Sequence, residues 1–148
     1  MKLSDFLSPT DVIADFVAAD KQKLLLELAR KGASIFDVRP DQVFTELTKR
    51  EELGSTGVGD GVAIPHARFH QVTKPYGLLV RLKKPLAFDA VDGSPVDIVF
   101  LLLLPETAKG EQLSALALIA RKLRDPAITA ALRHARDSAE MYRALATD

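Results

Sequence analysis

The nine residues from 96 to 104, VDIVFLLLL, are the feature that most constrains the fold. All of them except Asp97 are apolar, so polar and apolar residues do not alternate along this stretch. Such a run is typical of a β-strand that is covered on both faces, because a strand with one exposed face alternates. The run is also far too short for the ~20 residues that a membrane-spanning helix needs. It therefore predicts a central strand in a sheet with helices on both sides.

Helix signals occur on both sides of this strand. Asp20 is a plausible N-cap for a helix from 21 to about 33, and Pro40 suits the first turn of a second helix, which Gly54 ends. Similar signals predict helices over 111–124, from 126 and after the capping-box pattern at 137–140, and extended segments over 12–18, 62–66 and 77–82. The fold class expected is α/β, one domain over residues 1–148 with a mixed β-sheet sandwiched by helices.

Charge and cysteine content exclude several function classes. The chain has 20 lysines and arginines against 20 aspartates and glutamates, so its formal net charge is zero. This balance gives no electrostatic reason to expect a nucleic-acid partner or a membrane surface. Cysteine is absent, which removes disulfides, thiolate catalysis and cysteine-based zinc sites. The first residues lack the apolar core of a signal peptide, so we expect a cytoplasmic protein without membrane insertion.

The segment 54–68, GSTGVGDGVAIPHAR, places four of the eight glycines of the chain within eight residues and then presents His66 behind a proline. Three interpretations compete: a phosphate-binding nucleotide loop, half of a metal site, or a loop shaped around a reactive histidine. The nucleotide interpretation fails on spacing. The glycines form G-x-G-x-G, and Asp60-Gly61 stands where a P-loop requires lysine and then serine or threonine.

The metal interpretation depends on His66 and His70, which are four residues apart. This spacing serves a zinc site when both histidines lie on one face of a helix. Pro65 and the glycines argue against a helix here, and no glutamate lies between the two histidines. A surface position for His70 is therefore the better interpretation, and no metal site is expected.

The third interpretation has a chemical rationale. Glycines permit tight turns, and consecutive N–H groups can form a nest for an anion. With an ordinary pKa of about 6.5, His66 is largely neutral near pH 7, so a ring nitrogen could attack phosphorus. Arg50 lies one helical turn before Gly54, and its guanidinium could bind phosphoryl oxygens. From the residues alone, a solvated arginine in a charged cluster is an equally good interpretation of Arg50.

The stretch 50–66, REELGSTGVGDGVAIPH, resembles the active-site segment of enzyme IIA proteins of the phosphoenolpyruvate phosphotransferase system. The resemblance is to the fructose/mannitol type and, more narrowly, to its nitrogen-regulatory branch. It continues through residues 85–106, PLAFDAVDGSPVDIVFLLLLPE, and 113–125, LSALALIARKLRD, and so covers nearly the whole chain. It implies the mannitol-type enzyme IIA fold.

In this resemblance His66 matches the histidine that is reversibly phosphorylated on Nε2. The donor would be a small histidine phosphocarrier protein of the HPr/NPr type, itself charged by enzyme I from phosphoenolpyruvate. Arg50 matches the active-site arginine, and Thr56, Gly57 and Gly59 match the loop around the phosphate. The resemblance thus implies a phosphoryl carrier rather than a turnover enzyme, and it implies no cofactor.

The sequence departs from the family pattern at one site position. The family commonly has a second active-site histidine near the start of the helix expected here from Glu111, and this position is occupied by Gln112. A glutamine can donate a hydrogen bond to a phosphoryl oxygen, but it cannot carry a proton or a positive charge. Gln112 is therefore either a phosphate ligand of altered character or a surface residue of the helix.

Three functions follow from the residues and the resemblance. The leading hypothesis is a regulatory phosphocarrier of the nitrogen-related system, whose two forms bind partners such as potassium transporters or sensor kinases differently. The alternatives are a sugar-specific IIA component that passes phosphate to a IIB domain, and an interaction module that works without phosphorylation. The last has only Gln112 in its favour. The sequence leaves the oligomeric state open.

Overall fold

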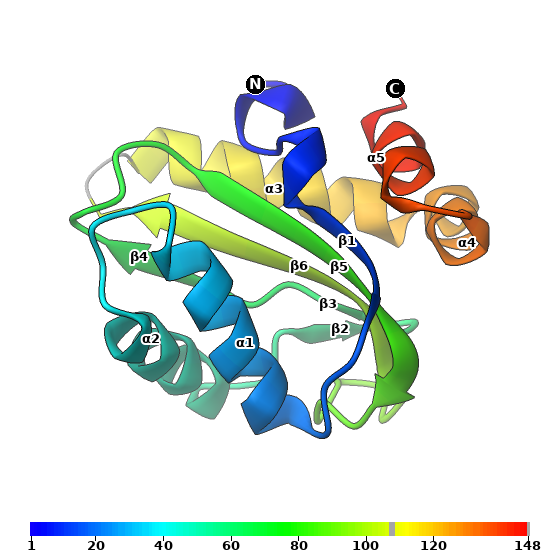
Figure 1. Cartoon of the computed structure of the whole chain (residues 1–148), viewed down its shortest axis with the longest axis horizontal. Coiled ribbons are helices and arrows are strands. Elements are labelled where there is room, and N and C mark those ends of the chain that lie inside the picture. Colours follow the sequence, from blue (N-terminus) through cyan, green and yellow to red (C-terminus); the bar gives the residue numbers. More distant parts are fainter. Residues whose placement is uncertain (107–108, 148) are drawn as a thin grey trace.

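The computed structural model describes residues 1–106 and 109–147. Two short 3-10 helices, Leu3–Asp5 and Pro9–Asp11, precede the first strand. The strands in the described residues are β1 (Val12–Phe16), β2 (Gly57–Gly59), β3 (Val62–Ala63), β4 (His66–Phe69), β5 (Tyr76–Leu86) and β6 (Val96–Pro105). The helices are α1 (Lys21–Ala33), α2 (Pro40–Glu52), α3 (Lys109–Arg124), α4 (Pro126–His134) and α5 (Ser138–Ala146). Figure 1 shows their arrangement.

The strands form one mixed sheet in the order β1-β5-β6-β3-β2, and β4 also pairs with β6. β1 is parallel to β5, β5 is antiparallel to β6, and both β3 and β4 are parallel to β6. β6 therefore pairs with three strands and lies at the centre of the sheet. Apart from Asp97, its residues from 96 to 104 are at most 3% exposed, which confirms the central strand predicted from the apolar run.

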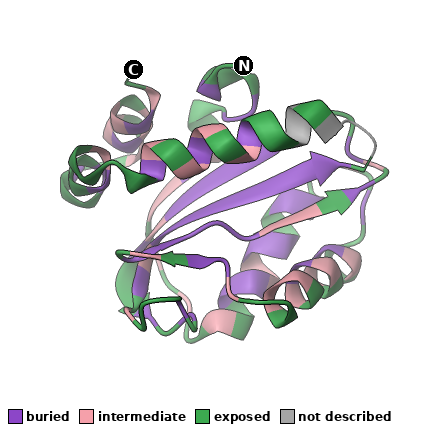
Figure 2. Ribbon diagram, turned by 180° about the vertical axis from the view of Figure 1, so that it is seen from behind, coloured by how far each residue is buried: buried purple, intermediate pink, exposed green. Residues whose placement is uncertain are grey.

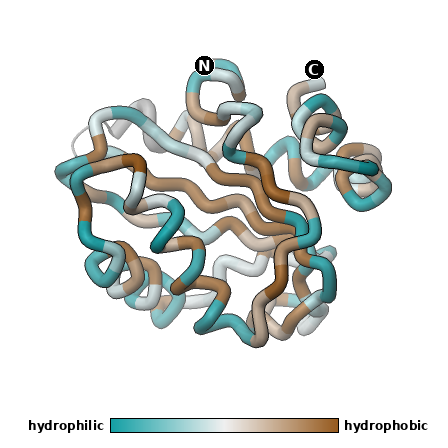
Figure 3. The backbone as a smooth tube through the Cα atoms, in the orientation of Figure 1, coloured by the Kyte–Doolittle hydropathy of each residue, from teal (hydrophilic) through white to brown (hydrophobic). Residues whose placement is uncertain are grey.

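Helices cover both faces of the sheet. Alternate residues of β6 point to opposite sides. Leu101 and Leu103 belong to the core beneath α1 and α2, whereas Phe100 and Leu102 belong to the core beneath α3, α4 and α5. Figures 1 and 2 show these two helical layers with the buried strands between them, and Figure 3 shows apolar residues running along the central strands. The predicted mixed sheet sandwiched by helices is thus confirmed.

Local signals set the helix starts. The Asp20 carboxylate accepts a hydrogen bond of 2.8 Å from the backbone N–H of Lys23, and α1 spans the predicted residues 21–33. Pro40 occupies the first turn of α2, where its missing N–H leaves no partner unsatisfied. The Asp137 carboxylate accepts from the N–H of Glu140 at 2.8 Å and so caps α5.

The structure differs from the sequence expectation in the segment that carries the glycines and His66. β2 and β3 form a short hairpin, and its turn residues Asp60 and Gly61 have positive φ angles of 55° and 79°. The extended piece expected over 62–66 is divided between β3 and the first residue of β4. Neither β2 nor β4 was predicted, because strands of three and four residues are too short to show a periodic pattern.

Candidate functional site

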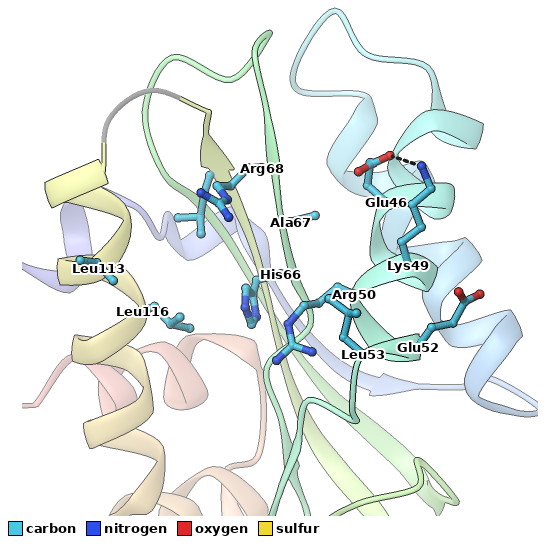
Figure 4. Close-up of a pocket in the computed structure, with 11 residues that line it drawn as sticks. Glu46, Lys49, Arg50, Glu52, Leu53, His66, Ala67, Arg68, Leu113 and Leu116 are labelled. Atoms are coloured by element: carbon cyan, nitrogen blue, oxygen red, sulfur yellow. Dashed lines mark hydrogen bonds and ion pairs between the residues drawn. The ribbon is translucent and has the colours of Figure 1, made fainter.

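A cavity of about 730 Å³ lies between α2 and α3, at the edge of the sheet formed by β4 (Figure 4). α2 contributes charged side chains from its C-terminal half, and α3 contributes Leu113 and Leu116. His66, Ala67 and Arg68 of β4 form the floor between the two helices. The pocket thus gathers residues that are far apart in the sequence around one histidine.

β4 determines which side chains face α3. His66 is paired with Leu102 of β6, and Arg68 with Leu104. Because side chains alternate along a strand, His66 and Arg68 share one face, about 7 Å apart along β4. The neighbouring residue Phe69 points to the opposite side and is buried in the core beneath α1 and α2. Burial of Phe69 therefore fixes the register that turns His66 and Arg68 toward the pocket.

A hydrogen bond defines the tautomer of His66. Its Nδ1 lies 2.8 Å from the carbonyl oxygen of Ile64. A carbonyl can only accept, so Nδ1 carries the hydrogen and, in the neutral ring, Nε2 keeps its lone pair. Burial lowers the pKa of His66 below its ordinary value, and the charges of Arg50 and Arg68 also lower it, against the opposing effects of the Ile64 bond and Glu51. The ring is therefore neutral at pH 7 with a nucleophilic Nε2.

Arg50 lies in the last turn of α2 and lines the pocket beside His66. Figure 4 shows its guanidinium close to the imidazole ring. One of its nitrogens, Nη1, donates to the carbonyl oxygen of Gly54 at 2.8 Å, which holds the side chain over the start of the loop. No carboxylate among the described side chains forms an ion pair with Arg50, so its charge is available to an anion in the pocket.

The loop that follows α2 is held by a buried carboxylate. Glu51, with a side chain 6% exposed, accepts hydrogen bonds from the N–H of Thr56 (3.0 Å) and from the Thr56 hydroxyl. Lys21 at the start of α1 pairs with the same carboxylate at 3.0 Å. The backbone N–H of Thr56 is thus bonded to a carboxylate of the chain itself, whereas the next N–H, that of Gly57, is bonded to the Ser55 hydroxyl. Glu51 was missed in the sequence because its burial depends on α1, which is distant in the chain.

The loop residues expected around a phosphate, Thr56, Gly57 and Gly59, do not line the pocket as far as the structure describes it. Gly57 packs against Ala90, and a Cβ at Gly57 would lie 2.9 Å from the Ala90 Cα. Gly59 pairs with Val62 in the hairpin. Val62 and His66 pair with residues 98 and 102 of β6, four residues apart, so Gly59 lies about 13 Å from His66 along the direction of β6. A phosphate-binding role for Thr56, Gly57 and Gly59 stays a prediction. Gln112 belongs to α3, but its side chain lies outside the described residues, and its role also stays a prediction.

The segment around His66 is extended rather than helical, so His66 and His70 do not form the helical pair of a zinc site. His70 is exposed just beyond β4. In the described part of the chain, no group of three or more histidines, aspartates and glutamates could hold a metal ion. A membrane span also has no candidate there, since none of the described helices is both long and apolar enough.

Two further features of the pocket escaped the sequence reasoning. Arg68 could have been found from its spacing, because the second residue after His66 shares its face if the segment is a strand. Leu53 and Leu113, which line the pocket from its two sides, are 85% and 70% exposed. Their exposure depends on how α2 and α3 flank the pocket, so no local signal marks them.

Comparison with known proteins places this chain in a family. The family described as phosphoenolpyruvate-dependent sugar phosphotransferase system, EIIA 2, matches residues 5–147. The chain therefore belongs to this family. A nitrogen regulatory protein of Bradyrhizobium diazoefficiens is 44% identical over 146 residues, which cover 99% of this chain and 95% of that protein. A nitrogen regulatory protein of Escherichia coli is 40% identical over 122 residues, 82% of this chain and 73% of that protein.

Solved structures agree with this placement. The crystal structure of nitrogen regulatory protein IIA-Ntr from Neisseria meningitidis matches with a TM-score of 0.92 and 35% identity over 97% of this chain and 98% of that one. The crystal structure of mannitol IIA from Escherichia coli has a TM-score of 0.72 at 20% identity, over 92% of this chain and 96% of that one, which shows the shared fold. The resemblance to nitrogen-regulatory IIA proteins is thus confirmed.

Proposed function

We propose that this protein is a regulatory phosphocarrier of a nitrogen-related phosphotransferase system. His66 accepts a phosphoryl group on Nε2 from a histidine phosphocarrier protein, and the two forms of the chain bind regulated partners differently. The observation that carries the proposal is the state of His66, a neutral ring whose Nδ1 is bonded to the Ile64 carbonyl and whose pocket also contains Arg50. Its relatives named as nitrogen regulatory proteins support the regulatory branch.

The transfer needs little rearrangement on the acceptor side. The Nε2 lone pair of His66 attacks the phosphorus of the donor phosphohistidine while the P–N bond of the donor breaks and its electron pair returns to the donor ring. No proton has to leave Nε2 first, because the hydrogen of the acceptor ring is on Nδ1. Such a transfer requires mainly positioning and compensation of negative charge, which the Ile64 bond and Arg50 supply.

Phosphorylation would change the surface as well as the ring. A phosphoryl group adds about −1.5 to −2 charges near pH 7. His66 lies beneath a rim where Leu53 and Leu113 are mostly exposed. A partner that packs on these leucines would meet an uncharged histidine in one form and an anionic phosphoryl group in the other. This change in charge is how one interface would distinguish the two forms.

The test is phosphorylation of the purified chain with phosphoenolpyruvate, enzyme I and the phosphocarrier protein. We expect one acid-labile phosphoryl group on the wild type and none on His66→Ala. The matched control, His70→Ala, removes an exposed histidine outside the pocket lining and should label like the wild type. No label on the wild type, or equal label on His66→Ala, would overturn the proposal.

A second arm separates regulation from sugar transport. Labelled protein is mixed with a fructose- or mannitol-type IIB domain and its sugar. Under the proposal the label stays on the chain, and binding of candidate partners, such as potassium transporter subunits or sensor kinases, differs between the two forms. Sugar-dependent loss of the label would assign the chain to the sugar-specific function, and identical binding by His66→Ala, His66→Asp and wild type would make it a phosphorylation-independent module.

A further inference from the structure

The arginines of the chain divide according to their partners. Arg30, Arg39 and Arg136 each donate to a carboxylate, while Arg81 donates to backbone carbonyls of 132 and 135. Arg68 is exposed on β4 and forms no hydrogen bond or ion pair with the described residues. An arginine that lines a pocket without a partner keeps its full set of donors for a ligand.

The position of Arg68 relative to His66 is set by the sheet. The two side chains leave the same face of β4, about 7 Å apart along the strand. Figure 4 shows the His66 ring between Arg50, which comes from α2, and Arg68, which comes from the strand itself. Both positive charges act on the ring, since each of them lowers the pKa of His66. An anion attached to His66 would therefore have a guanidinium on two sides.

We infer that Arg68 is a second phosphate-binding residue, whose guanidinium binds oxygens of the phosphoryl group on His66 and supplies the positive charge that Gln112 cannot carry. The inference rests on the proposed function and names a further residue of the same site. Arg50 contributes one positive charge, and one of its nitrogens is already bonded to the Gly54 carbonyl. A guanidinium beside a dianionic phosphoryl group offsets its negative charge and binds two of its oxygens side by side.

The nature of this cation has a consequence for pH dependence. A histidine as the second cation would lose its charge as the pH rises through about 6.5, whereas an arginine keeps its charge up to pH 12 or so. Charge compensation at this site should therefore not decline between about pH 6 and pH 8.5. An Arg68→His variant should make it decline, because the replaced group titrates in that range.

The experiment measures the rate of phosphorylation of His66 with two donors. One donor is the phosphorylated phosphocarrier protein, and the other is phosphoramidate, a small molecule that needs no protein docking surface. Arg68→Gln should slow labelling from both donors about 10- to 100-fold, the loss expected for one charge-assisted contact to phosphate. Arg68→Lys should lie between Arg68→Gln and wild type. Arg68→His should approach the wild-type rate at pH 6 and the Arg68→Gln rate at pH 8.5.

The control is Arg124→Gln, which makes the same change of charge at an exposed position at the end of α3. It should label like the wild type. If Arg68→Gln slows transfer from the phosphocarrier protein but not from phosphoramidate, Arg68 contacts the donor protein rather than the phosphate, and the inference is wrong. Wild-type rates for Arg68→Gln with both donors would also overturn it. Failure of the proposed function looks different, because the wild type itself would then remain unlabelled at His66.

Discussion

The segment 54–68 reads as one motif in the sequence, but its two ends use charge in opposite ways. At the hairpin end, Arg133 binds the Asp97 carboxylate through both Nε and Nη2, at 2.9 Å each, and donates to the Asp60 carbonyl at 2.6 Å. At the histidine end, Arg50 and Arg68 form no ion pair with the described side chains. At the hairpin end the arginine is thus bound to groups of the chain itself, whereas at the histidine end the positive charges remain available to a ligand.

The backbone of the hairpin end supports this division. Gly61 has a φ of 79°, and Arg133 packs where a Cβ would be. The Asp92 carboxylate accepts from the N–H groups of Asp60 and Ser94, and these bonds lower the pKa of Asp92. The glycines there allow a tight turn and close packing. They belong to β2 and to the turn before β3, and none of them lines the pocket as described.

The largest effect on stability is expected from substitution of Glu51, whose carboxylate holds Thr56 near the start of segment 54–68. Glu51→Ala removes the nearer of two carboxylates that pair with Lys21, at 3.0 Å against 3.6 Å for Asp89, and the acceptor of two donors on Thr56. Loss of one member of a buried pair of this kind costs about 3 kcal/mol, and here Lys21 keeps partial access to water. Denaturant unfolding measures the effect. Glu52→Ala, at an exposed position beside it, should change stability by less than about 0.5 kcal/mol, and an equal loss in both variants would contradict the anchoring role.

Gly61→Ala tests the hairpin end alone. The left-handed backbone there costs about 1–2 kcal/mol for a residue with a Cβ, and this Cβ would also lie 2.6 Å from Arg133 Nη2. The folded variant should still accept a phosphoryl group on His66. Gly110→Ala in α3 is the matched control, since a Cβ added there would meet no described atom within 4 Å. If Gly61→Ala abolished labelling at full stability, the two ends would not be separable.

A pair of arginine substitutions sharpens the same comparison. Arg133→Gln breaks a two-pronged contact between partly buried side chains, 33% and 23% exposed, and should reduce the free energy of unfolding by about 1–2 kcal/mol. Arg68→Gln removes an exposed side chain without a described partner and should change it by less than about 0.5 kcal/mol. For the rate of phosphorylation of His66 we expect the opposite, a larger loss in Arg68→Gln than in Arg133→Gln. If one of the two variants lost more in both stability and phosphorylation rate, the distinction between the two ends would be contradicted.

The smallest effect is the pH dependence that His66 gives to folding. Its native pKa lies below the ordinary value of about 6.5, so the unfolded chain takes up the proton first as the pH falls. The stability that the neutral ring contributes is full above about pH 6.5 and is lost as the pH falls from there through the lowered native pKa. His66→Gln should flatten this part of the curve, and Arg133→Gln should keep it. An unchanged slope in His66→Gln would show that His66 is not the titrating group.

Much of the fold could be predicted because its signals are local. The apolar run of β6, the cap at Asp20 and the capping box at Asp137 each lie within a few neighbouring residues. β4 could not be predicted, since its four residues become a strand only by pairing with residues 102–105 of β6. The relation between His66 and Arg68 depends on that pairing, and the burial of Glu51 depends on Lys21. These features arise from contacts between distant parts of the chain.

The candidate site was predicted partly from the residues and partly from the resemblance to a known family. His66 was a candidate from the residues themselves, whereas Arg50 was assigned to the same site by the resemblance to enzyme IIA proteins, and both line the pocket. Gly57 and Gly59 were assigned to the phosphate by the same resemblance. In the structure Gly59 is at the far end of the hairpin, because a strand carries the chain about 3.3 Å away with every residue.

The central claim, that His66 carries the phosphoryl group on Nε2, is tested most directly by NMR of the phosphorylated chain labelled with nitrogen-15 in its histidines. Because Nδ1 donates to the Ile64 carbonyl, phosphorus should couple to Nε2 of His66, and Nδ1 should keep its hydrogen. Coupling of phosphorus to Nδ1, or a phosphoryl group on any residue other than His66, would contradict the claim.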